Sequence, residues 1–292
     1  MPTGSIESNI VVAVDGSPES DAAVAWAARE GAMRDVPVTL MHVISPVMIS
    51  VPVEPMFNPP DWYEHSARHI LEHAEKTLQS AWPGSGPADV QTVTAHAAVV
   101  PALVEASKEA QMVVVGNRGR GKLARLVLGS VSSGLLHHAQ CPVAVMRAEA
   151  DTHEPDGPIV VGIDGSPASE AATALAFDEA SRRGVELVAL HAWSDVGIDL
   201  MLDTDWHHYE DEARALLAKR LASWQQQYPD VCVHQRIVRD EPAYWLGEES
   251  RSAQLVVVGS HGRGGFAGML LGSTSSAVAQ TSSAPLIVVR GR

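Results

Sequence analysis

The chain contains two copies of one sequence unit, and this duplication limits its possible folds more than any other feature. Residues 10–23, IVVAVDGSPESDAA, match residues 159–172, IVVGIDGSPASEAA. A longer pair follows, VVVGNRGRGKLARLVLGSVSSG at 113–134 and VVVGSHGRGGFAGMLLGSTSSA at 256–277. A repeat of this length indicates one domain present twice. We expect three segments: a first domain over 1–147, a polar linker over 148–157 and a second domain over 158–292.

Within each copy, short apolar runs alternate with amphipathic stretches long enough for helices. Runs rich in Val and Ile, without polar alternation, indicate strands buried on both faces of a parallel sheet. The sequence therefore predicts an α/β fold with two tandem doubly wound domains, each a five-stranded parallel sheet with helices on both faces. Such sheets bind ligands beyond the carboxyl ends of their strands, where the strand order reverses. In the first copy we expect strands at about 9–15, 37–44, 90–95, 111–116 and 142–147, and helices at about 18–34, 61–81, 99–110 and 130–140.

A glycine pattern follows the fourth expected strand of each copy: Gly-x-x-Gly, nine residues, then Gly-Ser. Glycines allow a backbone to approach a ligand closely, and the Gly-Ser pair opens a helix whose free N–H groups can hold a phosphate. The alternative is a glycine-rich turn with an ordinary serine cap. Identical spacing in two otherwise diverged copies favours a ligand site. The pattern residues are Gly116, Gly119, Gly129 and Ser130, and Gly259, Gly262, Gly272 and Ser273.

Two other phosphate motifs fit these loops poorly. The P-loop pattern needs Lys followed by Ser or Thr, but Leu123 follows Lys122 and Gly265 replaces the lysine in the second copy. The dinucleotide fingerprint belongs in the first strand-to-helix turn, whereas GRGKLA at 119–124 follows the fourth strand.

Composition excludes several classes of function. The formal net charge of −14 disfavours nucleic acids and anionic membranes as main partners. The sequence has neither a signal peptide nor an apolar stretch of roughly 18 residues, so we expect a soluble, cytoplasmic protein without membrane insertion. Cys141 and Cys232 lie at no metal-ligand spacing, which predicts neither a disulfide nor a metal site. His42 and His191 share one repeat position in a strand and are read as buried or site-edge histidines.

The quoted motifs together resemble those of a tandem universal stress protein of actinobacterial type, and the complete glycine pattern resembles the ATP-binding branch of that family. The resemblance implies one ATP in each domain, with Mg²⁺ possible. Asp15 and Asp164 would accept hydrogen bonds from ribose, and the backbones of Val43 and Ala192 would pair with adenine. Further residues would contact adenine and ribose (Val115, Gly116, Val258, Gly259) or the phosphates (Gly119, Gly129, Ser130, Val131, Ser132, Gly262, Gly272, Ser273, Thr274, Ser275).

The resemblance also implies a regulatory protein of stress adaptation or growth arrest, in hypoxia or dormancy, and not an enzyme. By the same resemblance, the final strands of the two halves would pair and join them as an internal pseudo-dimer. Two such chains could then form a homodimer. Two alternatives stay open: a slow ATPase or an adenylyl- or phosphotransferase with an aspartate on magnesium, and a nucleotide-independent scaffold. The first loop carries more basic residues than the second, which keeps only Arg263. If the basic side chains of the first loop touch the phosphates, the first site should bind the nucleotide more tightly than the second. Otherwise these side chains face solvent or pair with acidic groups. The basic residues of the first loop are Arg118, Arg120, Lys122 and Arg125.

Overall fold

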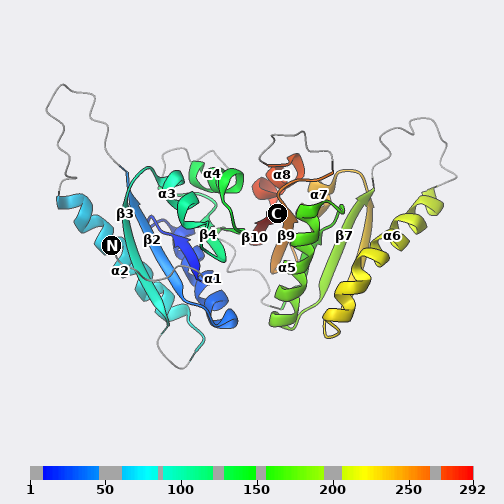
Figure 1. The fold of residues 1–292 in the computed structure, drawn as a ribbon, viewed down its shortest axis with the longest axis horizontal. Helices are drawn as coiled ribbons and strands as arrows, with labels where there is room; N and C mark the ends of the chain where they lie inside the picture. Colours follow the sequence, from blue (N-terminus) through cyan, green and yellow to red (C-terminus); the bar gives the residue numbers. More distant parts are fainter. Residues whose placement is uncertain are drawn as a thin grey trace, which may run out of the picture. The chain divides into compact units, whose positions relative to one another are not determined.

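The chain forms two compact units, which we call unit 1 (Met1–Asp151) and unit 2 (Thr152–Arg292). The computed structural model describes residues 9–45, 61–84, 88–120, 128–148, 156–193, 206–263 and 271–291. Each unit is an α/β domain with one parallel five-stranded sheet and helices on both faces, which confirms the predicted fold class (Figure 1). The described residues leave out the loop residues Lys122 and Arg125 and most of the linker. They also leave out most of the proline-rich segment 45–62, which the sequence predicts to be a long loop, either over the mouth of the site or without a role.

The elements follow one another in the same order in both units. Unit 1 contains β1 (Ile10–Ala13), α1 (Pro18–Arg34), β2 (Val38–Ile44), α2 (Asp61–Ala81), β3 (Val90–His96), α3 (Val99–Ala106), β4 (Met112–Gly116), α4 (Ser130–His138) and β5 (Val143–Met146). Unit 2 contains β6 (Ile159–Gly162), α5 (Pro167–Arg183), β7 (Leu187–Trp193), α6 (Trp206–Gln227), β8 (Val233–Arg239), α7 (Pro242–Glu249), β9 (Leu255–Gly259), α8 (Ser273–Thr281) and β10 (Leu286–Val289).

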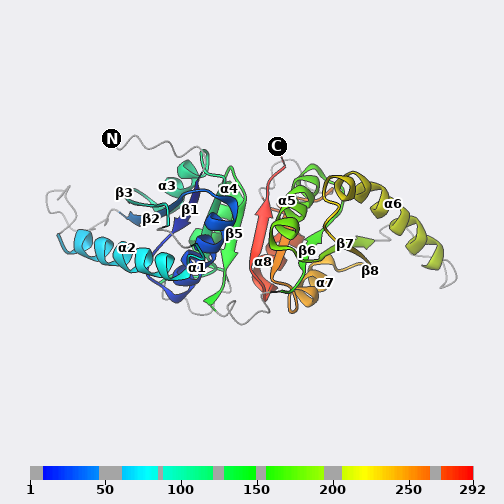
Figure 2. The ribbon, with the colours of Figure 1, turned by 90° about the horizontal axis from the view of Figure 1, so that it is seen from below.

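The strand order reverses once in each sheet. Unit 1 has the order β3-β2-β1-β4-β5, and unit 2 has the order β8-β7-β6-β9-β10. All pairs within each sheet are parallel, and the central strands β1 and β4 are apolar and buried. Helix α1 packs against α2 and α3 packs against α4, and the two pairs cover opposite faces (Figures 1 and 2). The reversal lies between β1 and β4, where a doubly wound sheet offers a crevice.

Serines fix the start of the first helix in each unit, where the repeated segment DGSP places a serine directly before a proline. The Ser17 Oγ accepts a hydrogen bond from Ser20 N at the start of α1, and Pro18 occupies the first turn. Ser166 caps α5 in the same way. The repeated Ser-Pro pair therefore sets the residue at which the first helix of each unit begins.

Helices α3 and α4 are shorter than predicted, and one serine connects their ends. The Ser107 Oγ donates to Val104 O (2.6 Å) and accepts from Gln140 N (2.9 Å). Ser250 makes the equivalent pair of bonds in unit 2. Among the described residues, no helix combines the length and apolar character needed to cross a bilayer.

Candidate functional site

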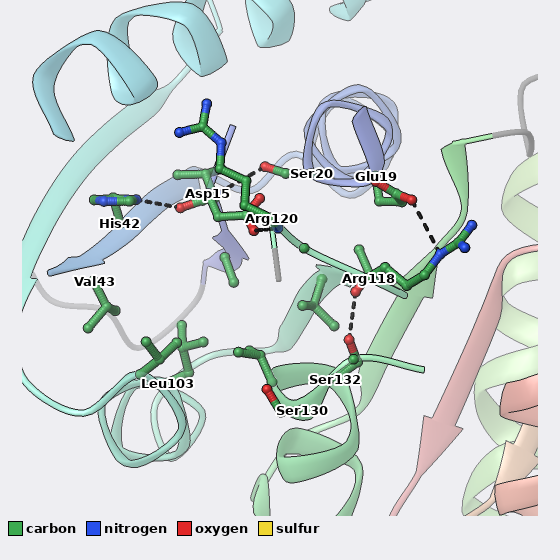
Figure 3. Close-up of a pocket in the computed structure, with 18 of the residues that line it drawn as sticks. Asp15, Glu19, Ser20, His42, Val43, Leu103, Arg118, Arg120, Ser130 and Ser132 are labelled. Atoms are coloured by element: carbon green, nitrogen blue, oxygen red, sulfur yellow. Dashed lines mark hydrogen bonds and ion pairs between the residues drawn. The ribbon is translucent and has the colours of Figure 1, made fainter. Parts of the chain in front are cut away.

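Each unit has a cavity at the carboxyl ends of its strands, where the strand order reverses. The cavity of unit 1 is about 540 Å³ and that of unit 2 about 330 Å³, both in the range of small-molecule sites (Figure 3). All predicted site residues of unit 1 line the first: Asp15, Val43, Val115, Gly116, Gly119, Gly129, Ser130, Val131 and Ser132. All predicted site residues of unit 2 line the second: Asp164, Ala192, Val258, Gly259, Gly262, Gly272, Ser273, Thr274 and Ser275.

The carboxylate of Asp15 ties the end of β1 to the glycine loop. Its Oδ1 accepts from Ser17 N (2.9 Å) and Ser17 Oγ (2.6 Å), and its Oδ2 accepts from Arg120 N (2.9 Å). A carboxylate has about four acceptor positions, so one remains for a ligand hydroxyl. Asp164 accepts from Ser166 N and Arg263 N, which leaves two positions free.

Contacts inside the protein, more than the approach of a ligand, require the glycines. A Cβ added to Gly116 would lie 2.7 Å from Glu19 Cβ in α1, and one added to Gly119 would lie 2.3 Å from Asp15 Oδ2. The equivalent glycines of unit 2 are just as confined: Gly259 by Ala168 and Gly262 by Asp164. The reason we gave for these glycines from the sequence was therefore incomplete, because their spacing reports how the loop packs on α1 and the aspartate.

Helices α4 and α8 begin with unsatisfied amides that face the cavities. Both have a glycine N-cap, Gly129 or Gly272, without a side-chain hydrogen bond. In α4 the first intrahelical bond runs from Ser133 N to Gly129 O, so the N–H groups of residues 130–132 have no helical partner. The serine-capped α1 satisfies one such amide from within the protein, whereas α4 and α8 leave theirs for a ligand. Three free amides at the positive end of a helix dipole are groups that can bind an anion.

The Ser132 hydroxyl holds this helix start in place and is not free to donate to an anion. Its Oγ donates to Gly116 O (2.6 Å), and Ser275 Oγ donates to Gly259 O (2.5 Å) in unit 2. These bonds fasten the N-terminus of α4 or α8 to the end of the neighbouring strand (Figure 3). At this position the main-chain N–H is therefore the group that remains available to a phosphate.

Near the end of β2, a main-chain N–H and C=O face the end of the cavity away from the start of α4. Val14 N donates to Met41 O (2.9 Å), so the odd-numbered residues of β2 bond toward β1. Val43 is the next odd-numbered residue, and the described strand β1 already ends at Ala13. Its N–H and C=O therefore face the cavity as one donor and one acceptor. Ile163 N donates to Leu190 O (2.8 Å) in unit 2, which leaves Ala192 in the same position.

The repeated histidine explains why this edge stays open. His42 Nδ1 donates to Val14 O (2.7 Å), the carbonyl that the Val43 amide would otherwise reach. His191 Nδ1 donates to Ile163 O (2.6 Å) in the same way. Burial lowers the pKa of His191, with a further contribution from the nearby Arg263 and Arg220, so its ring is neutral near pH 7. Sequence reasoning gave the histidines no role here, although their shared repeat position was the available signal.

The two described basic residues of the first loop, Arg118 and Arg120, have partners within unit 1. Arg118 Nε lies 3.4 Å from Glu19 Oε1, and an Arg120 terminal nitrogen donates to Gly16 O (3.2 Å). Both arginines also line the cavity, so their contacts with Glu19 and the Gly16 carbonyl do not remove them from the site (Figure 3). Apolar side chains that the sequence did not indicate also line the cavities: Val99 and Leu103 in unit 1, Pro242 and Leu246 in unit 2.

Comparison with known proteins assigns both units to one family. The model of the universal stress protein family matches residues 8–147 and 157–290. A universal stress protein of Mycolicibacterium smegmatis is 54% identical over 294 residues, covering 100% of both chains. The crystal structure of a universal stress protein from Archaeoglobus fulgidus matches with a TM-score of 0.73 and 20% identity, over 97% of this chain and 98% of that one.

A universal stress protein determined in complex with cAMP is 25% identical, with a TM-score of 0.37, over 49% of this chain and 98% of its own. The two family matches together span nearly all of both units, and the relative from Mycolicibacterium smegmatis aligns from end to end. The chain belongs to the universal stress protein family and carries two of its domains in tandem.

Proposed function

We propose that each unit binds one ATP and that the protein acts as a nucleotide-dependent regulator of a stress response or growth arrest. One observation carries the proposal: unbonded main-chain groups flank both cavities at matching positions. The edge at Val43 or Ala192 offers a donor beside an acceptor, which is the pattern that the edge of adenine complements. The start of α4 or α8 offers amides to an anion. Asp15 or Asp164 lies between these two groups and can accept from a sugar hydroxyl.

The same geometry supports binding without rapid turnover. Hydrolysis or phosphoryl transfer needs a group that positions a nucleophile and a metal that bridges phosphates. Three hydrogen bonds already occupy the Asp15 carboxylate, so in unit 1 it is a poor candidate for a magnesium ligand. Asp164 has one bond fewer, which makes unit 2 the place to look for weak hydrolysis. In this proposal, Mg²⁺ enters with the nucleotide.

A proline at the first position of α4 tests the anion site directly. Gly129, with φ −73° and ψ 163°, already has the extended conformation that a following proline needs, and proline is favourable at the first helical position. Ser130→Pro therefore removes one amide donor without disrupting the helix. A charge-assisted hydrogen bond is worth about 1.5–3 kcal/mol, so we expect ATP affinity in unit 1 to fall by about tenfold or more. Ser130→Ala, which keeps the amide, is the control.

The measurement is ATP binding by calorimetry, together with the identity and number of nucleotides released from freshly purified, denatured protein. We expect two sites in the unmodified protein, one weakened site in Ser130→Pro, and the other weakened site in Ser273→Pro. If neither proline affects binding, the anion site is wrong. If no nucleotide binds at millimolar concentration, the scaffold alternative holds. If the protein releases ADP and phosphate, and Asp164→Ala abolishes the release, the protein is an enzyme.

A further inference from the structure

A thiol, an imidazole and a carboxylate converge at the amino-terminal edge of the sheet in unit 2. Cys232 and His234 are two residues apart at the start of β8, so their side chains share one face. Leu187 N donates to Cys232 O (2.9 Å), which brings Glu186, just before β7, alongside. The ligand atoms of the three side chains all lie within 4.8 Å of one another. Among the residues that the structure describes, this is the one group of three or more such side chains.

Two of the three distances between the ligand atoms are close to those in a tetrahedral zinc site, and the third, between Cys232 and Glu186, is within 4.8 Å. The Cys232 Sγ lies 3.7 Å from His234 Nε2, which lies 3.2 Å from Glu186 Oε2. Zinc bonds of about 2.3 Å to sulfur and about 2.1 Å to nitrogen and oxygen place tetrahedral ligands about 3.4–3.6 Å apart. Thiolate, imidazole and carboxylate are also the three ligand types of zinc sites. A zinc ion could therefore bind with only small side-chain movements.

The face that carries these groups is open to solvent. The next residue on it, Arg236, contacts α7 through Glu249 (3.3 Å) and lies over the Trp245 ring (5.6 Å). Helix α7 ends at Glu249, so the edge beyond is left uncovered. His234 and Glu186 are more than half exposed, and Cys232 is exposed. A metal ion and an additional ligand can reach the cluster directly.

Unit 1 provides an internal comparison. The positions that match Glu186, Cys232 and His234 are Pro37, Asp89 and Gln91, which include neither a thiol nor an imidazole. The fold itself therefore does not require the three ligands. A histidine–glutamate pair of nearly identical geometry, His96 with Glu64 (3.1 Å), occurs elsewhere in unit 1 and is half exposed. No cysteine forms a ligand cluster with that pair among the described residues.

We propose that unit 2 binds one Zn²⁺ ion through Cys232 Sγ, His234 Nε2 and the Glu186 carboxylate, with water in the fourth position. The thiol loses its proton when the metal binds. The site lies at the opposite end of β7 from the nucleotide cavity, about 20 Å away over six residues of strand. The sequence predicted no metal site because the spacing of Cys232 and His234 resembles no zinc motif and the third ligand comes from another strand.

The test uses the full-length, untagged protein, stripped of metal and reduced with a phosphine. Co²⁺ is titrated as a spectroscopic probe, and Zn²⁺ affinity is measured by competition with a chromophoric chelator. We expect one equivalent per chain and a thiolate-to-cobalt charge-transfer band. Cys232→Ser should abolish the band, and His234→Gln and Glu186→Gln should each weaken Zn²⁺ binding by about tenfold or more. His96→Gln should change neither.

Two results would overturn the site. The first is the absence of the charge-transfer band in the unmodified protein. The second is Zn²⁺ binding by Cys232→Ser with unchanged affinity, which would place the metal on other histidines. All these residues are exposed, so the variants should unfold at the temperature of the unmodified protein, which thermal denaturation checks. ATP binding should be unaffected by Cys232→Ser, which separates this proposal from the proposed function.

Discussion

The packing of the protein itself requires a glycine at position 119, whether or not a ligand is bound. The position that an added Cβ would take lies 2.3 Å from Asp15 Oδ2, and that carboxylate accepts the amide of Arg120 (2.9 Å). A side chain at position 119 must displace either the loop or the carboxylate. Part of the cost of a side chain here therefore arises in the protein before any ligand binds.

Gly119→Ala should lower the free energy of unfolding of the nucleotide-free protein by about 1 kcal/mol, through loss of the hydrogen bond between Arg120 N and Asp15. Urea denaturation of stripped protein measures this. Gly247→Ala in α7 is the comparison for adding a methyl group without a clash, because the added Cβ meets nothing closer than Thr281 Oγ1 at 3.5 Å; it should raise the free energy of unfolding by about 0.5–1 kcal/mol, as alanine does in a helix. Unchanged stability of Gly119→Ala, combined with weaker ATP binding, would mean that the glycine matters only for ligand contact.

At the scale of the elements, the two copies of one helix end differently. Helix α1 ends at Asp35, which has a left-handed backbone (φ 54°), and α5 ends at Gly184 with φ 65°. An added Cβ at Gly184 would meet no atom within 4 Å, so only the backbone conformation favours glycine there. A side chain in this conformation costs energy that glycine avoids.

Asp35→Gly should therefore raise the free energy of unfolding of unit 1 by about 0.5–1 kcal/mol, because glycine is the usual residue at a left-handed helix end. The reciprocal Gly184→Ala should destabilise unit 2 by a similar amount. Thermal denaturation of both variants measures the effect. A destabilised Asp35→Gly would show that the exposed carboxylate of Asp35 stabilises the helix end more than its backbone conformation costs.

The sequence predicted most of the fold, because its signals are local. Strands such as β4 are continuous apolar runs, and the Ser-Pro starts of α1 and α5 are short-range caps. The repeat located the glycines that follow the strands, and the resemblance to the universal stress protein family supplied the other site residues; all of them line the two cavities. Three features were not predicted because each depends on a contact between residues far apart in the sequence. His42 donates to the Val14 carbonyl, Ser107 bonds to the ends of both α3 and α4, and Asp15 leaves no room for a side chain at Gly119.

At the scale of the whole molecule, each unit carries one cysteine, in opposite surroundings. Burial raises the pKa of the Cys141 thiol to about 12, and Cys232 is exposed. At pH 8 only about one Cys141 in 10,000 would be a thiolate, so the folded unit 1 protects it from alkylation. The reactivity of the Cys141 thiol therefore reports on the core of unit 1, and that of the Cys232 thiol on the surface of unit 2.

A maleimide in the presence of a chelator should modify Cys232 alone in the folded protein and both cysteines in denaturant. Labelling of Cys141 should require unfolding, and ATP at a hundred times its dissociation constant should slow it about 100-fold if unit 1 binds the nucleotide. Mass spectrometry of the two peptides follows both rates. Labelling of Cys141 at a rate independent of ATP would indicate either local opening or an empty first site.

The crowded glycines have a consequence for the evolution of this family. Because Gly116 and Gly119 are held by Glu19 and Asp15, selection for a foldable chain would retain them even after a descendant had stopped using a nucleotide. The glycine signature would then persist as an inherited trait and lose its value as a marker of binding. The N-caps Gly129 and Gly272 are less confined: an added Cβ would lie 3.3 Å from the carbonyl oxygen of Asn117 or Ser260, so a capping serine or aspartate needs only a small shift of the backbone. Among diverged descendants, that single N-cap position should distinguish the chains that still hold an anion from those that do not.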